Sequence, residues 1–201
     1  MRYVDLLVKR LFDFCACLIG LIFLSPFILV ICIAIKADSK GPVFFHQERI
    51  GLRGKVFKIL KFRTMVINAE SIGEGLICRD EDDPRITKVG RLLRKTSLDE
   101  LPQLINVLAG DMSIVGPRPP VTYHPYKGYD SYSEFAKKRF DMRPGITGLA
   151  QVLKRNSAAW DERIVIDVRY IENFNLILDM KIIIRTFSAL FYREEYTENI
   201  K

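Results

Sequence analysis

Two adjacent carboxylates, Asp99 and Glu100, are the residues of this sequence with the clearest capacity for chemistry. Proline is favoured at the first position of a helix, so a helix is predicted to begin at Pro102, with both carboxylates just ahead of its positive end. Carboxylates in such a place can bind Mg²⁺, and one of them can act as a nucleophile on phosphorus. The alternative is a helix capping box, in which the Ser97 side chain accepts from the backbone N–H of Glu100. On residue types alone the capping box is favoured.

A carboxylate that attacks a diphosphate needs positive charge around it. Two unit negative charges about 4 Å apart repel by about 4 kcal/mol at an effective dielectric constant of about 20. Arg118 lies between Pro117 and Pro119, whose rings restrict the backbone, so less entropy is lost when the guanidinium binds a phosphate. A plain surface turn is the alternative for this segment. Further basic residues precede the carboxylates: Arg91, Arg94 and Lys95.

Composition limits the class of protein. The chain has 201 residues, which suits one catalytic domain better than two domains with separate cores. Charged residues make up 27%, too many for a polytopic membrane protein. The net charge of +7 predicts an anionic partner such as nucleic acid, acidic lipid or a phosphorylated substrate. Residues 49–63 contain six basic residues and no acidic one, which is typical of a phosphate or lipid cradle or of a solvated basic face.

Other site chemistries receive no support from the sequence. His46 and His124 are far apart and accompany no serine or cysteine motif, which argues against a hydrolase triad and a histidine-ligated metal. There is no Walker-type loop and no GxGxxG motif. No CxxC pair occurs, which argues against a zinc site.

Residues 14–35 form an uncharged stretch long enough to cross a hydrocarbon core of about 30 Å as a helix. Pro26 cannot donate to the carbonyl of Ile22, and Ser25 is predicted to bond back to the carbonyl of Leu21, so a bend is expected midway. Basic residues flank both ends, and both ends are therefore expected on the cytoplasmic side. A re-entrant helix broken at Ser25-Pro26 would place both ends on the cytoplasmic side. Physical reasoning alone slightly favours the alternative, a kinked helix that spans the membrane once.

The remaining segments predict a small β-hairpin and several helices. β-branched and aromatic residues on both sides of Gly51 and Gly54 predict a hairpin over residues 43–59. Residues 132–140 show a helical stripe, and residues 143–148 read as a turn-rich linker. Residues 176–191 predict a broad amphipathic helix with Asp179 on its polar side, which either packs on the core or lies in the bilayer interface.

Several longer motifs make the chain recognisable over nearly its whole length, from Lys9 to Thr186. It resembles the monotopic phosphoglycosyl transferases of bacteria, in their small form with the catalytic core alone. The motifs that carry this resemblance are Gln47-x-Arg49-x-Gly51, Lys61-Phe62-Arg63-Thr64-Met65, Asp83-Pro84-Arg85-Ile86-Thr87, Arg94-Lys95-Thr96-Ser97-Leu98-Asp99-Glu100-Leu101-Pro102-Gln103, Gly110-Asp111-Met112-Ser113, Gly116-Pro117-Arg118-Pro119 and Arg143-Pro144-Gly145-Ile146-Thr147-Gly148-Leu149-Ala150-Gln151.

The resemblance implies a mainly helical α+β fold with a re-entrant membrane helix and flanks in residues 1–40, a membrane-surface catalytic domain in residues 41–201, and amphipathic interfacial helices. It implies a ping-pong reaction in which Asp99 attacks a UDP-sugar, releases UMP and passes the sugar phosphate to polyprenol phosphate. Glu100 would assist, and both carboxylates would hold Mg²⁺. The remaining implied contacts are phosphate binding by Arg118 with Pro117 and Pro119, site-lining positions Lys61 and Arg94, substrate contacts Arg155 and Asp167, and the membrane-helix break at Ser25 and Pro26.

The implied partners are a UDP-sugar, polyprenol phosphate and membrane lipid, without nucleic acid. The resemblance leaves room for downstream glycosyltransferases and for a second copy of the chain. It places the protein at the bacterial inner membrane, with the catalytic domain on the cytoplasmic face. Leu153-Lys154-Arg155 and Asn175 differ from the residues that are usual in the family. For this reason the resemblance assigns substrate contacts less firmly to Arg155, Asp167 and Asp179. Two rivals stay open: a non-enzymatic, membrane-anchored basic module, and an enzyme in which the lipid phosphate attacks directly.

Overall fold

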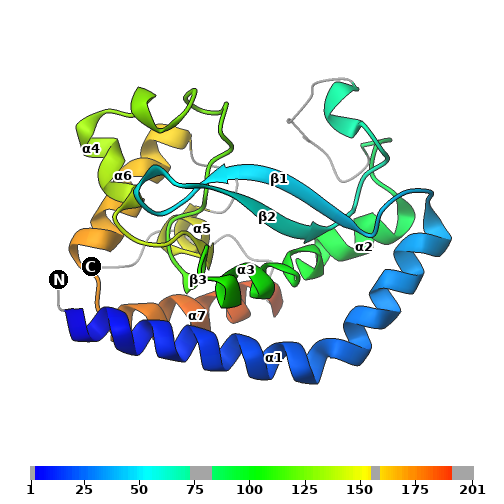
Figure 1. Ribbon diagram of the computed structural model, residues 1–201, viewed down its shortest axis with the longest axis horizontal. Helices are drawn as coiled ribbons and strands as arrows, with labels where there is room; N and C mark the ends of the chain where they lie inside the picture. Colours follow the sequence, from blue (N-terminus) through cyan, green and yellow to red (C-terminus); the bar gives the residue numbers. More distant parts are fainter. Residues whose placement is uncertain (1–2, 73–82, 155–158, 192–201) are drawn as a thin grey trace.

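The computed structural model describes residues 3–72, 83–154 and 159–191 (Figure 1). The described chain is mainly helical with little sheet, as predicted. Its helices are α1 (Tyr3–Asp38), α2 (Lys88–Lys95), α3 (Gln103–Ala109), α4 (Glu134–Lys137), α5 (Leu149–Lys154), α6 (Trp160–Glu172) and α7 (Leu176–Phe191). Its strands are β1 (Phe44–Ile50), β2 (Val56–Phe62), β3 (Ser113–Val115) and β4 (Gly145–Thr147).

The long helix α1 bends near its middle, and the rest of the chain lies on one side of it (Figure 1). Within the described residues it is the one helix long and apolar enough to cross a membrane. The Ser25 hydroxyl donates to the carbonyl of Ile22 at 2.8 Å, so the predicted bond to Leu21 is wrong. Pro26 has no N–H to offer the Ile22 carbonyl, and Ser25 supplies the missing donor at that oxygen.

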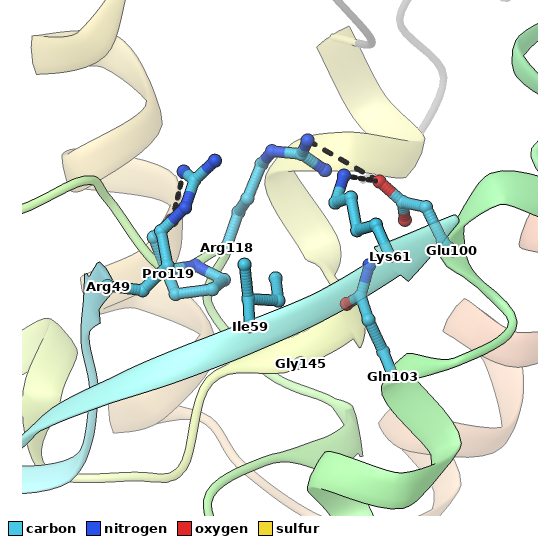
Figure 2. A pocket seen from close by; sticks show the side chains of 8 residues that line it. All are labelled: Arg49, Ile59, Lys61, Glu100, Gln103, Arg118, Pro119 and Gly145. Atoms are coloured by element: carbon cyan, nitrogen blue, oxygen red, sulfur yellow. Dashed lines mark hydrogen bonds and ion pairs between the residues drawn. The ribbon is translucent and has the colours of Figure 1, made fainter. Parts of the chain in front are cut away.

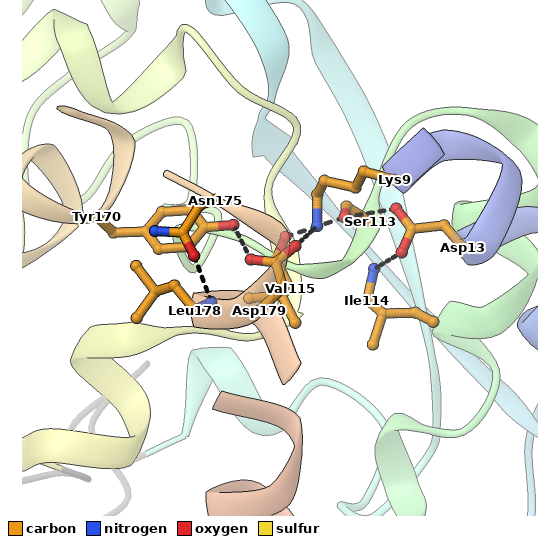
Figure 3. A network of polar contacts seen from close by, with 9 residues as sticks. All are labelled: Lys9, Asp13, Ser113, Ile114, Val115, Tyr170, Asn175, Leu178 and Asp179. Atoms are coloured by element: carbon orange, nitrogen blue, oxygen red, sulfur yellow. Dashed lines mark hydrogen bonds and ion pairs between the residues drawn. The ribbon is translucent and has the colours of Figure 1, made fainter. Parts of the chain in front are cut away.

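A buried polar network fastens the first half of α1 to α7 and β3 (Figure 3). Lys9 Nζ lies 2.5 Å from Asp179 Oδ2, and the Tyr170 hydroxyl donates to Asp179 Oδ1 at 2.7 Å. Four residues further along α1, Asp13 accepts from the Ser113 hydroxyl at 2.6 Å. Asp179 is 5% exposed, so its predicted place on the polar side of α7 is wrong. The ion pair with Lys9 explains why a carboxylate is tolerated among apolar residues.

Removal of one partner of this pair is expected to destabilise the protein strongly. Lys9→Met leaves Asp179 buried without its cation, which costs about 3–5 kcal/mol and lowers the unfolding temperature by roughly 10 °C. The matched control is Lys138→Met, because Lys138 and Glu172 form a pair at 2.9 Å whose side chains are 50% and 54% exposed. The control should change the unfolding temperature by less than about 3 °C. Equal shifts in thermal denaturation would contradict the assignment of Lys9 and Asp179 as an anchor.

The predicted hairpin is confirmed as the antiparallel pair β1–β2, with Gln47 opposite Ile59. Phe57 and Ile59 are buried against Val107 of α3 and Met112. Side chains alternate along a strand, so Lys61 lies on the same face as Ile59. The hairpin therefore directs one lysine toward the segment that precedes α3.

Two predicted segments differ from the structure. Residues 143–148 are no linker, because β4 pairs in parallel with β3, with Ser113 opposite Gly145. Glycine makes this pairing possible: a Cβ at Gly145 would lie 2.1 Å from the backbone nitrogen of Gly116. The stripe at 132–140 is no long helix but one turn of α4 followed by a single 3₁₀ turn. By contrast, the predicted helix over residues 176–191 is confirmed as α7.

Candidate active site

Asp99 and Glu100 lie in a single 3₁₀ turn, Leu98–Glu100, between α2 and α3. Ser97 has φ 57°, in the left-handed region, and makes no capping hydrogen bond with its side chain, so the capping box is wrong. An N-cap residue needs extended backbone angles, which Ser97 does not have. Helix α3 begins at Gln103, with Pro102 as the residue before it. The carboxylates therefore lie ahead of a helix N-terminus, one residue from the predicted boundary.

Glu100 brings two cations together at its carboxylate (Figure 2). Lys61 Nζ donates to Glu100 Oε1 at 2.6 Å, and an Arg118 guanidinium nitrogen lies 3.5 Å from the same oxygen. Lys61 comes from β2, Glu100 from the turn before α3, and Arg118 from the proline-rich loop that also contains Pro117 and Pro119. The site therefore forms only when the three segments meet. Charges that are far apart in the sequence thus form one cluster.

The pKa values of the two carboxyl groups are shifted in opposite directions. Burial raises the pKa of Asp99, and the neighbouring Glu100 raises it further, while Lys61 opposes both effects. Burial acts in the same direction on Glu100, but Lys61 and Arg118 outweigh it and lower the pKa of Glu100 to about 2. Burial lowers the pKa of Lys61, and Glu100 opposes that shift. Glu100 is therefore held ionised, whereas Asp99 is the less stabilised and more basic carboxylate.

Two guanidinium groups hold the backbone on which Arg118 sits. Arg139 donates to the carbonyl of Arg118 at 3.0 Å and to Asp167 Oδ2 at 2.6 Å, and Arg49 donates to the carbonyl of Pro119 at 3.0 Å. Arg139 is 1% exposed and Asp167 is 2% exposed. Asp167 thus lies beneath the loop, in contact with Arg139, and Arg139 connects it to the Arg118 backbone. The Arg118 side chain is 35% exposed, so it can meet a ligand from solvent.

A small pocket opens over this cluster (Figure 2). Its lining residues are Arg49, Ile59, Lys61, Glu100, Gln103, Arg118, Pro119 and Gly145. The walls carry three basic side chains and one carboxylate, which suits an anionic ligand such as a phosphate. Arg49 and Gln103 received no site role from the sequence, although both stand in quoted motifs. For Gln103 the signal was its place in the same quoted motif as Asp99 and Glu100, four residues after Asp99.

Two other predicted site residues, Arg94 and Pro117, are not among the described residues that line this pocket. Arg94, at the end of α2, lowers the pKa of Asp99 through its charge, which places it near that carboxylate. Pro117 lies beside Arg118 in a neighbouring hollow under the loop. Arg155 falls outside the described residues. Within the described ranges, no group of three or more His, Cys, Asp or Glu side chains could hold a metal ion by itself.

The sequence matches a known family of proteins over most of its length. Residues 4–193 match the family described as bacterial sugar transferase. The chain belongs to this family. A bacterial sugar transferase is an enzyme, so the match decides against a non-enzymatic basic module as the main role of the fold.

Three relatives of this sugar transferase show how far the similarity extends. The galactosyl transferase CpsE of Streptococcus agalactiae is 41% identical over 94% of this chain. The exopolysaccharide production protein ExoY of Sinorhizobium fredii is 39% identical over 94% of it. The UDP-glucose:undecaprenyl-phosphate glucose-1-phosphate transferase of Klebsiella pneumoniae is 43% identical over 91% of it. The aligned region covers 43% of CpsE and 40% of the Klebsiella protein, but 88% of ExoY.

Proposed function

We propose that this sugar transferase moves a sugar 1-phosphate from a UDP-sugar to polyprenol phosphate and releases UMP. The observation that carries the proposal is Glu100 paired with Lys61 and Arg118 in a pocket open to solvent, with Asp99 next to it in the same turn. The Klebsiella relative is named for this reaction with UDP-glucose and undecaprenyl phosphate. Its product would begin the membrane steps of glycan assembly, and the name of ExoY, an exopolysaccharide production protein, fits such a role.

The reaction is proposed to proceed in two steps through Asp99. In the first, an Asp99 carboxylate oxygen attacks the phosphorus that bears the sugar, the bond to the bridging oxygen breaks, and UMP leaves. Lys61 and Arg118 reduce the repulsion between the carboxylate and the diphosphate. In the second, an oxygen of the lipid phosphate attacks the same phosphorus and the Asp99 carboxylate leaves. Glu100, ionised between its two cations with a pKa of about 2, is too weak a base to take a proton from the lipid phosphate, so its proposed role is to hold Lys61 and Arg118 toward the phosphates.

The residues present fit a magnesium ion, because Mg²⁺ is usually bound by one or two carboxylates together with substrate phosphates. Asp99 and Glu100 would hold it. The ion would neutralise charge on the diphosphate and orient its leaving group. Glu100 already contacts Lys61 and Arg118, so Asp99 is the carboxylate with more capacity for a metal ion.

We propose that the protein lies at the cytoplasmic face of the bacterial inner membrane, and its apolar surface supports a membrane location. Most of the apolar window of α1 is unburied within the chain. Helix α7 buries Ile182 in the core but exposes four large apolar side chains: Ile177, Met180, Ile184 and Phe187. These side chains would lie in the bilayer interface beside α1. We propose that α1 enters the membrane and returns to the same side, with its bend at Ser25-Pro26.

Labelling from the cytoplasmic side tests this topology. In a cysteine-free variant, Tyr3→Cys and Lys40→Cys place one thiol near each end of the apolar helix. We expect an impermeant thiol reagent added from the cytoplasmic side to label both. Protection of either position, with labelling restored after the membrane is dissolved, would show that α1 spans the bilayer.

Kinetic order tests the proposed reaction. The enzyme is mixed with a panel of UDP-sugars that includes UDP-glucose and UDP-galactose, without any polyprenol phosphate. We expect one member to give a burst of UMP equal to the amount of enzyme, because the first step needs no lipid. Release of UMP only after the lipid is added would favour direct attack by the lipid phosphate. No UMP with any sugar, but salt-sensitive binding of acidic lipid that ignores Asp99, would favour the basic module.

A further inference from the structure

Gln103 is a buried polar residue of the pocket whose amide donor lacks a partner. It is the first residue of α3 and is 2% exposed. Its Nε2 atom is buried and makes no hydrogen bond within the part of the chain that the structure describes. A buried donor without an acceptor destabilises a protein, so such an atom calls for an explanation.

The position of the Gln103 amide in the pocket explains why its donor has no partner. Gln103 rises from α3 toward Lys61, and both side chains line the same pocket as Arg118 (Figure 2). The described donors around the pocket include the Lys61 ammonium and the Arg118 guanidinium, which attract an anion with several acceptor oxygens. An anion bound between them would bring an acceptor within reach of the Gln103 amide.

We infer that Gln103 is a substrate-binding residue, whose Nε2 donates to a phosphoryl oxygen of the diphosphate held between Lys61 and Arg118. The inference rests on the proposed function and names one more contact for that substrate. The hydrogen bond forms only when the ligand is present, so the amide stays unsatisfied in the free enzyme. This distinguishes Gln103 from a glutamine that stabilises the fold.

Gln103→Met tests the inference, because methionine keeps the length of the side chain and removes the donor. A hydrogen bond to a charged group corresponds to roughly a 10- to 100-fold effect, so kcat/KM for UMP release should fall by that factor. The affinity for inorganic pyrophosphate, measured by calorimetry, should fall at least about tenfold for the same reason. The unfolding temperature of the free protein should stay the same or rise, since an unsatisfied buried donor has been removed.

Asn106 provides the matched control on the same helix. It is also a buried amide, but it donates to the carbonyl of Lys58 and accepts from the N–H of Leu60, each at 2.9 Å. Asn106→Leu leaves both backbone groups without partners, so its unfolding temperature should fall. A fall of similar size in Gln103→Met would show that Gln103 serves the fold, and the inference would be overturned.

The pyrophosphate titration separates the inference from the proposed function, because it requires no turnover. If the wild-type enzyme releases no UMP but Gln103→Met weakens pyrophosphate binding, the proposed reaction fails and the phosphate contact stands. If the wild-type enzyme turns over and Gln103→Met matches it in both measurements, the contact is wrong and the reaction stands. Failure of the wild-type protein to bind pyrophosphate would also overturn the contact.

Discussion

Replacement of Asp99 by asparagine is expected to abolish release of UMP from the UDP-sugar. Asparagine keeps the shape of the side chain but cannot attack phosphorus, so the first step should slow by on the order of 10⁴-fold or more. The unfolding temperature should stay within about 4 °C of wild type. The reason is that attraction of Asp99 to Lys61 is offset by repulsion from Glu100 and by burial. The measurement is UMP formed over time, with the folded fraction determined on the same sample.

Asp130→Asn is the matched control for this variant. Asp130 is exposed and lies in the turn Tyr129–Ser131, a different segment from the turn Leu98–Glu100 that holds Asp99. The same change of chemical group should leave UMP release at the wild-type rate. Turnover of Asp99→Asn at a rate close to that of Asp130→Asn would end the assignment of Asp99 as the nucleophile.

Arg118→Met is expected to have the second largest effect. The guanidinium can bind a phosphate through two parallel N–H groups, and loss of a donor that stabilises developing charge typically costs about 10²–10³ in rate. Arg118→Lys keeps the charge but loses the planar pair of donors, so we expect it to recover only part of the activity. Both variants should fold normally, because the loop is held through the backbone carbonyl of Arg118 by Arg139 and not through the Arg118 side chain. The measurement is kcat/KM for UMP release.

Lys58→Met is the control for charge alone. Lys58 is exposed on the face of β2 opposite Ile59 and Lys61, and its loss changes the net charge by the same amount. A general electrostatic attraction between a basic surface and an anionic substrate would make the two methionine variants equally slow. We expect Lys58→Met to match wild type at physiological salt, where charges more than about 8 Å apart are largely screened.

Much of the site could be predicted because its reactive residues are neighbours in the sequence. Asp99 and Glu100 are adjacent, and Pro102 indicated a helix that starts just after them, although residue types alone favoured the capping box. The hairpin followed from β-branched and aromatic residues on both sides of two glycines, and α7 followed from a sustained helical period. These signals are local, and local physical preferences decide them.

The errors arose where contacts between distant segments decide the outcome. Ser97 has the residue type of a cap, but its left-handed backbone removes that role. The Pro-Gly-rich stretch around Gly145 has the composition of a turn, yet close approach to Gly116 makes it a strand. Asp179 lies on the polar side of its own helix by pattern, but Lys9, 170 residues away, buries it as an ion pair. The donor of Gln103 became notable only once the fold enclosed it.

The most direct measurement of the central claim is the mass of the protein itself after reaction with its UDP-sugar. The reaction is quenched before any polyprenol phosphate is added, and the intact protein and its peptides are weighed. The account predicts an increase equal to one sugar phosphate, confined to the peptide that contains Asp99 and lost when the lipid is supplied. An unmodified Asp99 peptide in a mixture where UMP and glycolipid both accumulate would contradict it.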